Sequence, residues 1–470
     1  MRRTKIVATI GPACHSSDVI ARLLDAGMDV ARLNLSHGTH DEHAELCAQV
    51  RRASDRAGRA VGVLLDLQGP KIRLGTFAGG TATLATGATF TLTSKPVVGS
   101  SRRASTTYAD LPRDVNPGDT VLIDDGLVRL RVESVRGADV HTRVLEGGEV
   151  SDRKGINLPG VRVSAPPLTE KDRDDLAFAL SLPADLLALS FVRHAEDAQA
   201  VRQAMAASGV VVPVIAKLEK PEAVDNLEAI VNAFDGLMVA RGDLGVELPL
   251  ERVPLVQKRA VRLAREQAKP VIVATQMLES MIHHSRPTRA EASDVANAVL
   301  DGADALMLSA ETSMGEHPVL AVETMSRIIV TAESEGALAI PEIAHRAHTP
   351  QEAIAAAAAL VAQNLGASEL VAFTQSGATA RCLSSHRSAI PLLAFTTVPA
   401  VRSQLALAWG VETFIAPAVA DTDAMVAQVD RLLLELGRAR RGDWVVIVAG
   451  TPPGTPGSTN MLRTHRLGGS

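Results

Sequence analysis

Aromatic residues are scarce in this chain, at 2% of 470 residues. Proteins that bind single-stranded nucleic acid stack the bases on aromatic side chains, so the composition argues against such a platform. The formal charge of -5 combines 48 basic with 53 acidic residues, and both signs are dispersed along the sequence. Without a basic footprint, we expect neither nucleic acid nor a membrane surface as a partner.

Cysteines and long apolar runs are also few. Cys14, Cys47 and Cys382 lie far apart and form no CxxC pair, which favours a reducing compartment over a disulfide framework or a zinc site. No apolar run reaches the roughly 18 residues that a membrane-spanning helix needs. The apolar segment behind the basic residues 2 and 3 ends at Gly11, too early for the core of a signal peptide. We therefore expect a cytoplasmic protein.

The sequence is rich instead in short apolar segments that end in a polar or charged residue. Eight of them are predicted as strands: Thr4–Ile10, Met28–Asn34, Val61–Asp66, Ala184–Ser190, Val212–Lys217, Gly236–Ala240, Pro270–Thr275 and Ala305–Ser309. Continuous rather than alternating apolar residues are typical of parallel strands covered on both faces. With helical patterns between them, they predict a (β/α)8 TIM barrel, in which the chemistry lies at the carboxyl ends of the strands.

The pattern changes between residues 69 and 166 to short alternating segments rich in Thr, Val and Gly. Antiparallel strands are predicted at Thr81–Leu84, Thr89–Thr93, Thr120–Ile123, Leu127–Val132 and Val140–Leu145. We expect a small inserted β-barrel domain. Because it leaves the main barrel after the third strand, at the catalytic face, it is placed to act as a lid.

A charged, alanine-rich connection over Glu333–Gln351 follows the barrel. Strands are then predicted at Leu370–Thr374, Leu392–Phe395, Thr413–Ile415 and Trp444–Ala449, with helices between them. This pattern indicates an open α/β domain. The expected boundaries are 1–68 and 167–335 for the barrel, 69–166 for the lid and 350–470 for the C-terminal domain. Gly450–Gly457 is read as a loop, since it lacks the lysine of a P-loop.

Two neighbouring strand ends carry charged residues suited to phosphate and metal. Lys217 and Glu219 are two residues apart and so lie on one side of the strand line, and Asp243 follows the next strand. A lysine there suits a phosphate or an enolate, and two carboxylates suit magnesium. Gly242 lets the backbone approach a ligand closely. The alternative is a salt bridge among the three charged residues with no catalytic role.

Polar residues end the other strands as well. Thr275 and Ser309 are candidates for relaying a proton through hydroxyls and water, although strand-end hydroxyls often only cap the next helix. Asn34, Ser36 and Asp66 are oxygen donors of the kind that bind a cation.

Arg32 and Arg73 lie on either side of these oxygen donors in the sequence. Together with the strand-end lysine and carboxylates, they predict a cavity for a small, multiply charged, phosphorylated acid.

Seven motifs resemble the pyruvate kinase family: Thr4–Pro12, Arg32–Gly38, Leu65–Arg73, Lys154–Gly160, Ile215–Pro221, Gly236–Pro249 and Pro287–Glu291. The resemblance covers essentially the whole chain, including the lid and the C-terminal domain. It implies transfer of the phosphoryl group of phosphoenolpyruvate to ADP, then protonation of the enolate to pyruvate, the last step of glycolysis. It also implies a homotetramer, which is usual in the family.

The resemblance carries roles for individual residues. Glu219 and Asp243 would hold Mg²⁺ or Mn²⁺. The implied catalytic residues are Lys217, Arg73, Thr275 and Ser309. The implied substrate-binding residues are Arg32, Lys217, Gly242, Asp243 and Thr275. The implied nucleotide-binding residues are Pro12, Asn34, His37, Arg73 and Lys154, and His37 by itself would be read as a surface histidine.

One departure concerns potassium. Many family members carry Glu where this chain has Lys71, and these require K⁺ in a site formed by Asn34, Ser36, Asp66 and the next backbone carbonyl, here that of Leu67. An ammonium at Lys71 would supply that positive charge within the chain. We expect K⁺ not to be required. The alternative is that Lys71 is a solvated charge at the lid hinge.

The C-terminal domain contains a strand, a glycine turn and a helix start over residues 373–380. Backbone amides there, with the hydroxyls of Thr374, Ser376 and Thr379 around Gly377, form a cradle for an anion. The resemblance implies an allosteric phosphate site. Gln375 stands where relatives that respond to fructose 1,6-bisphosphate often have Lys, so we expect a sugar monophosphate or AMP. The alternative is a helix cap without a ligand.

Two functions of other classes share part of this pattern. A related barrel with carbon-carbon lyase chemistry would share the magnesium carboxylates, but it would not need the lid or the nucleotide motifs. A silent scaffold protein would have lost Lys217 or a metal carboxylate, and neither loss is present.

Overall fold

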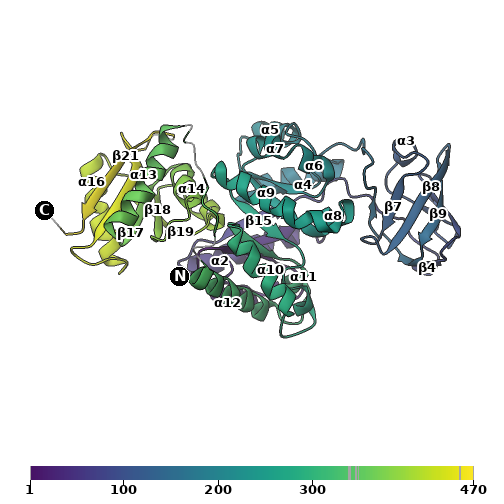
Figure 1. Cartoon of the computed structure of the whole chain (residues 1–470), viewed down its shortest axis with the longest axis horizontal. Coiled ribbons are helices and arrows are strands. Elements are labelled where there is room, and N and C mark those ends of the chain that lie inside the picture. The colour runs from purple at the N-terminus through teal and green to yellow at the C-terminus, as the bar shows by residue number, and fades with distance from the viewer. Residues whose placement is uncertain (1, 337–339, 344–346, 348, 455–456, 469–470) are drawn as a thin grey trace.

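The computed structural model describes residues 2–336, 340–343, 347, 349–454 and 457–468. Parts of the predicted connection Glu333–Gln351 and of the predicted loop Gly450–Gly457 lie outside the described residues. The barrel lies in the middle of the molecule, with the inserted β-structure at one end and the C-terminal α/β-structure at the other (Figure 1). Among the described helices, none has the length and apolar character to cross a membrane.

A closed parallel barrel confirms the predicted fold class. Its strands are β1 (Lys5–Thr9), β2 (Val30–Asn34), β3 (Gly62–Asp66), β12 (Leu186–Leu189), β13 (Val214–Leu218), β14 (Gly236–Ala240), β15 (Val271–Ala274) and β16 (Ala305–Leu308). The strands are buried on both faces, which is why they are continuous apolar runs in the sequence.

Helices follow the barrel strands, and most of them cover the outside of the barrel. They are α1 (Ser17–Ala26), α2 (His40–Ala57), α4 (Glu170–Ser181), α5 (Asp197–Ser208), α6 (Pro221–Asp225), α7 (Leu227–Ala233), α8 (Arg241–Glu247), α9 (Val253–Glu266), α10 (Arg289–Leu300), α11 (Ala310–Ser313) and α12 (Pro318–Gly336). Capping boxes at Thr39, Thr169 and Thr288 fix the starts of α2, α4 and α10. The core inside the barrel includes Ala406 and Leu407, so the C-terminal part packs into one end of the barrel.

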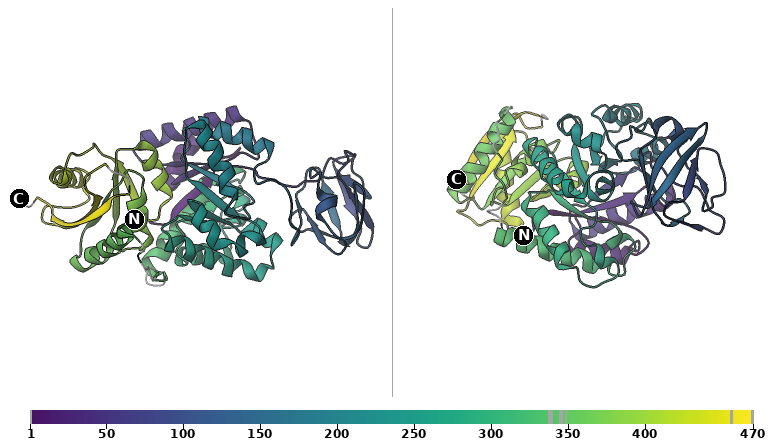
Figure 2. Two further views of the ribbon diagram at one scale, coloured as in Figure 1. Left: turned by 90° about the horizontal axis from the view of Figure 1, so that it is seen from above. Right: turned by 45° about the vertical axis from the view of Figure 1, so that its right-hand side comes forward.

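The insert after β3 forms two antiparallel-rich sheets around a core of its own. One has the order β11-β7-β8-β9-β5-β6 and the other pairs β10 with β4. The elements are β4 (Thr81–Leu84), β5 (Thr89–Thr93), β6 (Arg103–Ser105), α3 (Leu111–Asp114), β7 (Thr120–Ile123), β8 (Val128–Arg136), β9 (Asp139–Glu146), β10 (Gly148–Ser151) and β11 (Ile156–Asn157). Thin linkers join it to the barrel (Figure 2).

The C-terminal part is a five-stranded sheet of order β19-β18-β17-β20-β21. Its strands are β17 (Glu369–Phe373), β18 (Leu392–Thr396), β19 (Val411–Ile415), β20 (Trp444–Gly450) and β21 (Thr459–Arg466), and its helices are α13 (Pro350–Leu365), α14 (Ala378–Ser385), α15 (Pro399–Gln404) and α16 (Thr422–Glu435). Apolar residues of α13 and α14 pack on one face and those of α16 on the other. The sequence did not predict β21, which pairs antiparallel with β20.

Candidate active site

The carboxyl ends of the barrel strands bring Lys217 together with two carboxylates. Asp66 ends β3 and Lys217 is in β13, and because the strands are parallel their ends share one rim. The Lys217 ammonium lies 2.9 Å from Glu219 Oε1 and 3.4 Å from Asp66 Oδ1. It also donates a hydrogen bond of 2.6 Å to Ser190 Oγ. A largely buried cation, 12% exposed, therefore lies at the rim between two carboxylates.

The charges on the rim hold one another in their ionised forms. Arg32 Nε donates a 2.8 Å hydrogen bond to Asp66 Oδ2, and Asp66 is fully buried. Burial acts to raise the pKa of Asp66, but the charges of Lys217 and Arg32 outweigh it and the pKa is lowered. Burial acts to lower the pKa of Lys217, and the charges of Asp66 and Glu219 reverse this and raise it. Lys217 thus stays positive and Asp66 negative.

Glu219 and Asp243 form an acidic pair suited to a hard cation. Glu219 is 1% exposed, and its Oε2 accepts a 2.7 Å hydrogen bond from the Phe191 N–H. Burial raises the pKa of Glu219; Lys217 opposes this effect and Asp243 adds to it. In the described part of the chain no three His, Cys, Asp or Glu residues cluster as metal ligands. A divalent ion here would thus need substrate oxygens and water as well, which is usual for Mg²⁺.

Cationic side chains gather beside this acidic pair. Lys71 Nζ lies 3.8 Å from Asp243 Oδ1, and the lysine side chain is 32% exposed. The pKa of His37 is lowered by partial burial and by the charges of Arg73, Lys71 and Arg32. One imidazole therefore senses three cations, so this side of the rim is electropositive and suits a phosphate.

The oxygens of the expected monovalent site lie at the ends of β2 and β3. Asn34 pairs in register with Asp66, and its Oδ1 accepts a 3.2 Å hydrogen bond from the Ser36 N–H. The Leu67 carbonyl accepts a 2.7 Å hydrogen bond from Ser190 Oγ. Donors of the protein thus engage several of these oxygens.

Thr275 and Ser309 follow the neighbouring strands β15 and β16. The Thr275 hydroxyl accepts a 2.7 Å hydrogen bond from the Gly242 N–H and donates one of 2.6 Å to the Ala274 carbonyl. Thr275 has φ of 69°, a left-handed conformation that costs energy in a β-branched residue and often marks a functional site. The Ser309 N–H donates to Glu311 Oε2 at 2.7 Å.

Three predicted site residues lie toward the lid or the surface. Arg73 Nη1 donates a 3.0 Å hydrogen bond to the Arg153 carbonyl, and Lys154 lies 2.9 Å from Asp124 Oδ1. Pro12 is exposed in the turn between β1 and α1. In this structure Arg73 and Lys154 are thus tied to the base of the lid.

Two residues to which the sequence assigned no role support the site. Ser190 bridges Lys217 and the Leu67 carbonyl. Arg241 Nη2 donates a 2.8 Å hydrogen bond to the Thr275 carbonyl, and its Nη1 lies 2.7 Å from Asp294 Oδ1. Each directly follows a buried strand, and that position was the available signal.

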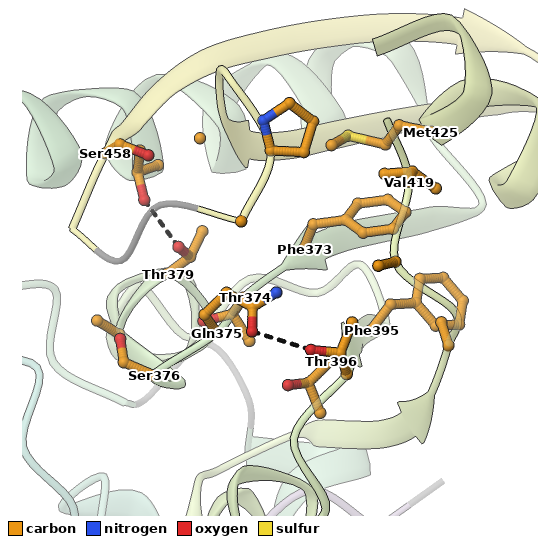
Figure 3. A pocket seen from close by; sticks show the side chains of 18 of the residues that line it. Phe373, Thr374, Gln375, Ser376, Thr379, Phe395, Thr396, Val419, Met425 and Ser458 are labelled. Carbon is orange, nitrogen blue, oxygen red and sulfur yellow. Dashed lines mark hydrogen bonds between the residues drawn. The ribbon is translucent and has the colours of Figure 1, made fainter. Parts of the chain in front are cut away.

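The C-terminal part contains an open pocket with about 670 Å³ of empty space. Figure 3 shows Phe373 and Phe395 on one side of it and Ser376 and Thr379 on the other. Its lining is thus apolar on one side and hydroxyl-bearing on the other.

The polar side of this pocket is largely hydrogen-bonded within the protein. Gln375 Oε1 accepts a 3.0 Å hydrogen bond from Thr397 Oγ1, and the hydroxyls of Thr379 and Thr459 lie 2.7 Å apart. Gly377, with φ of 78°, forms the turn into α14. Arg381, to which the sequence assigned no role, donates to the Ser376 carbonyl at 3.2 Å and so places a positive charge behind the turn.

Comparison with known proteins gives a consistent result over both parts of the chain. Residues 1–322 match the family model described as "Pyruvate kinase, barrel domain", and residues 352–465 match "Pyruvate kinase, alpha/beta domain". The chain is 61% identical to the pyruvate kinase of Mycobacterium tuberculosis strain H37Rv over 467 residues, covering 99% of both chains. It is 45% identical to that of Geobacillus stearothermophilus, covering 99% of this chain and 80% of the relative.

A solved structure shares the fold as well. The crystal structure of a pyruvate kinase from Cryptosporidium parvum superimposes with a TM-score of 0.92 at 37% identity, covering 99% of this chain and 96% of that one.

Proposed function

Because the chain belongs to the pyruvate kinase family, whose enzymes transfer the phosphoryl group of phosphoenolpyruvate to ADP in glycolysis, we propose that the rim residues described above perform this reaction. The observation that carries the proposal is the largely buried Lys217, whose ammonium lies 2.9 Å from Glu219 and 3.4 Å from Asp66. A fixed ammonium is the group needed where negative charge moves from phosphate to enolate.

Lys217 neutralises charge on the phosphoryl group in transfer and on the enolate oxygen. Arg32 is held by Asp66 and, with Arg73, steadies the phosphate. Glu219 and Asp243 would hold Mg²⁺ or Mn²⁺, which supplies further charge neutralisation for the phosphates.

Substrate contacts of the proposed site also come from the backbone. The Gly242 N–H donates a hydrogen bond to the Thr275 hydroxyl. These two residues form the wall of the substrate site next to Asp243. Thr275 and Ser309 belong to the network that delivers a proton to the enolate, since hydroxyls at neighbouring strand ends are able to orient water.

ADP would bind between the rim and the lid, with Pro12, Asn34, His37, Arg73 and Lys154 around it. The support is electrostatic, because His37 lies in the field of Arg73 and Lys71. Arg73 and Lys154 are attached to the base of the lid, so lid closure would bring them to the nucleotide.

Lys71 would replace the monovalent cation, which makes K⁺ unnecessary. Its ammonium is 3.8 Å from Asp243 at the edge of the active site, which favours this role over a solvated hinge charge. The oxygens of Asn34, Ser36, Asp66 and the Leu67 carbonyl would then be held by protein donors.

The C-terminal pocket would be the allosteric site, with Thr374, Gln375, Ser376, Gly377 and Thr379 holding a monophosphate. Its hydroxyls and helix start suit one phosphate, and its apolar wall suits a sugar or a base. A sugar monophosphate or AMP is the proposed effector.

The proposed enzyme has three domains. The barrel comprises residues 1–68 and 167–335, the lid 69–166 and the regulatory domain 350–470. The enzyme would work as a homotetramer in the cytoplasm, where its free thiols Cys14, Cys47 and Cys382 stay reduced.

The test measures pyruvate formation from phosphoenolpyruvate and ADP with Mg²⁺, coupled to lactate dehydrogenase. It is run in potassium chloride and in tetramethylammonium chloride at equal ionic strength. Equal rates are expected in the two salts. Activity in potassium alone would reject the role of Lys71. If the protein is inactive in both salts, with monophosphate effectors added, the lyase and silent-scaffold alternatives would be reopened.

A further inference from the structure

One short helix, α8, contacts both linkers of the lid. Asp243 and Glu247 are four residues apart on α8 and so lie on one face of it. Lys71 of the outgoing linker lies 3.8 Å from Asp243. Asn157 of β11, where the chain returns from the lid, donates a 3.1 Å hydrogen bond to Glu247 Oε1.

The two contacts differ in burial. The Glu247 side chain is 1% exposed, and Lys220 Nζ lies 2.5 Å from its Oε1. Breaking such a buried ion pair is costly because it leaves a buried charge without its partner. The Lys71–Asp243 pair is longer and about a third exposed on each side, so solvent weakens it. Of the two contacts with α8, that of the returning linker is therefore the firmer.

The same contacts connect the lid to the acidic pair of the active site. Lys220 directly follows Glu219 in the chain, and its ammonium lies 5.8 Å from the centre of the Phe191 ring. The Phe191 N–H donates to Glu219 Oε2. Residues of both linkers line one pocket together with Lys220 and Phe191.

Arg193 adds a second hold on the returning linker. Its guanidinium donates hydrogen bonds to the carbonyls of Val163 and Ala165, the latter at 2.6 Å. The backbone N–H of Arg193 is in turn bound by Asp197 Oδ2 at 2.7 Å.

We propose that Asn157, Glu247 and Lys220 form the pivot of the lid. They fix the returning linker on α8 and so position the lid relative to Glu219 and Asp243, while the weaker contact of Lys71 with Asp243 breaks. This inference rests on the proposed function, in which the lid closes over the rim and Asp243 turns from Lys71 to a metal ion. Asn157 and Lys220 are positioning residues, since they act through Glu247.

The test removes one hydrogen bond from the pivot. Asn157→Ala is expected to lower kcat about tenfold, because a lost bond to a buried carboxylate reduces the population of the correctly closed lid. Asn157→Asp keeps the shape but loses the donor, so it should be at least as impaired as Asn157→Ala. Asn157→Gln, which keeps the amide, should recover part of kcat.

Hydrogen exchange of the free enzyme provides a readout that a general loss of stability would not reproduce. Residues 158–166 should lose protection in Asn157→Ala, and residues 69–73 should exchange as in the wild type. The matched control is Thr142→Val, which removes a buried 2.7 Å hydrogen bond to the Phe90 carbonyl inside the lid. It should change exchange within the lid sheet and leave kcat and both linkers unchanged.

The proposal fails if Asn157→Ala keeps wild-type kcat and linker exchange, or if Asn157→Asp behaves like the wild type. It also fails if Thr142→Val has the same effect as Asn157→Ala. A wild-type enzyme without pyruvate kinase activity would instead reject the proposed function, and the exchange of residues 158–166 would still test the pivot.

Discussion

The barrel rim contains buried charged side chains, whereas the C-terminal pocket is lined by neutral ones. At the rim, Asp66 and Glu219 are buried against Lys217, and Arg32 adds a second cation. The C-terminal pocket is lined by hydroxyl, amide and apolar groups instead. Burying paired charges costs desolvation energy, but it holds the charged groups at fixed positions. Their electric field then suits a reaction in which charge moves. A neutral lining costs less and suits reversible binding of a small ligand.

The largest effect is expected when the central cation of the rim is removed. Lys217→Met should lower kcat by about a thousandfold, since it removes the charge that the proposed mechanism places next to the enolate. The coupled assay measures this, with circular dichroism to verify folding. Lys258→Met removes a lysine that is 56% exposed and should stay near the wild type. A Lys217→Met enzyme with more than about a tenth of normal activity would contradict this role.

The second prediction tests the proposed role of Lys71 by reversing its charge. Lys71→Glu should make the enzyme dependent on K⁺, with roughly ten- to hundredfold activation, because it replaces an ammonium 3.8 Å from Asp243 with a second anion that needs a neutralising ion. Titration with potassium at constant ionic strength measures the effect. Lys95→Glu changes an exposed lysine of the lid and serves as the control. If the two variants respond alike to K⁺, Lys71 has no special role.

The third prediction gives the C-terminal pocket a positive charge, as the rim has. Gln375→Lys should lower the half-activating concentration of fructose 1,6-bisphosphate by about tenfold, since it adds a charged donor for a second phosphate. Activation at subsaturating phosphoenolpyruvate is the measurement, with kcat at saturation unchanged. Gln363→Lys, on the exposed side of α13, adds the same charge outside the turn. An identical shift in the control would indicate a general charge effect.

The barrel was predictable because its strands are buried on both faces. A short continuous apolar run between turn residues is typical of a strand buried on both faces, and the predicted Gly236–Ala240 coincides with β14. The lid strands β8 and β9 were predictable for another reason: buried residues alternate with exposed ones in β8 and with partly buried ones in β9 over much of their length. In both cases one physical constraint applies along the whole strand and is visible in the sequence.

Features without such a constraint were missed. The edge strand β21 is mostly polar and only partly buried, so it has no apolar run to indicate it. Contacts between residues far apart in the sequence, such as Asn157 with Glu247 and Lys71 with Asp243, depend on how the linkers lie on α8. Strand-end position predicted which residues face the rim, but it could not predict their hydrogen-bond partners.

The smallest effect concerns a buried carboxylate of the C-terminal part that is not paired as those at the rim are. Glu369 Oε2 has no hydrogen-bond partner among the described residues. Burial raises the pKa of Glu369 to about 7, with Arg438 opposing the shift and Glu412 adding to it. Between about pH 4.5 and 7, the folded state therefore keeps a proton on Glu369 that the unfolded state has lost. Stability should fall as the pH rises through this range.

Glu369→Gln imitates the protonated form and should remove this loss. It is expected to match the wild type near pH 5 and to exceed it by roughly 1 to 2 kcal/mol at pH 8, allowing for partial solvent screening. Thermal unfolding at the two pH values measures the difference. Glu412→Gln breaks the ion pair with Arg438 and should destabilise the protein at both. If Glu369→Gln shifts both melting temperatures equally, Glu369 stays ionised and the contrast with the rim would not extend to it.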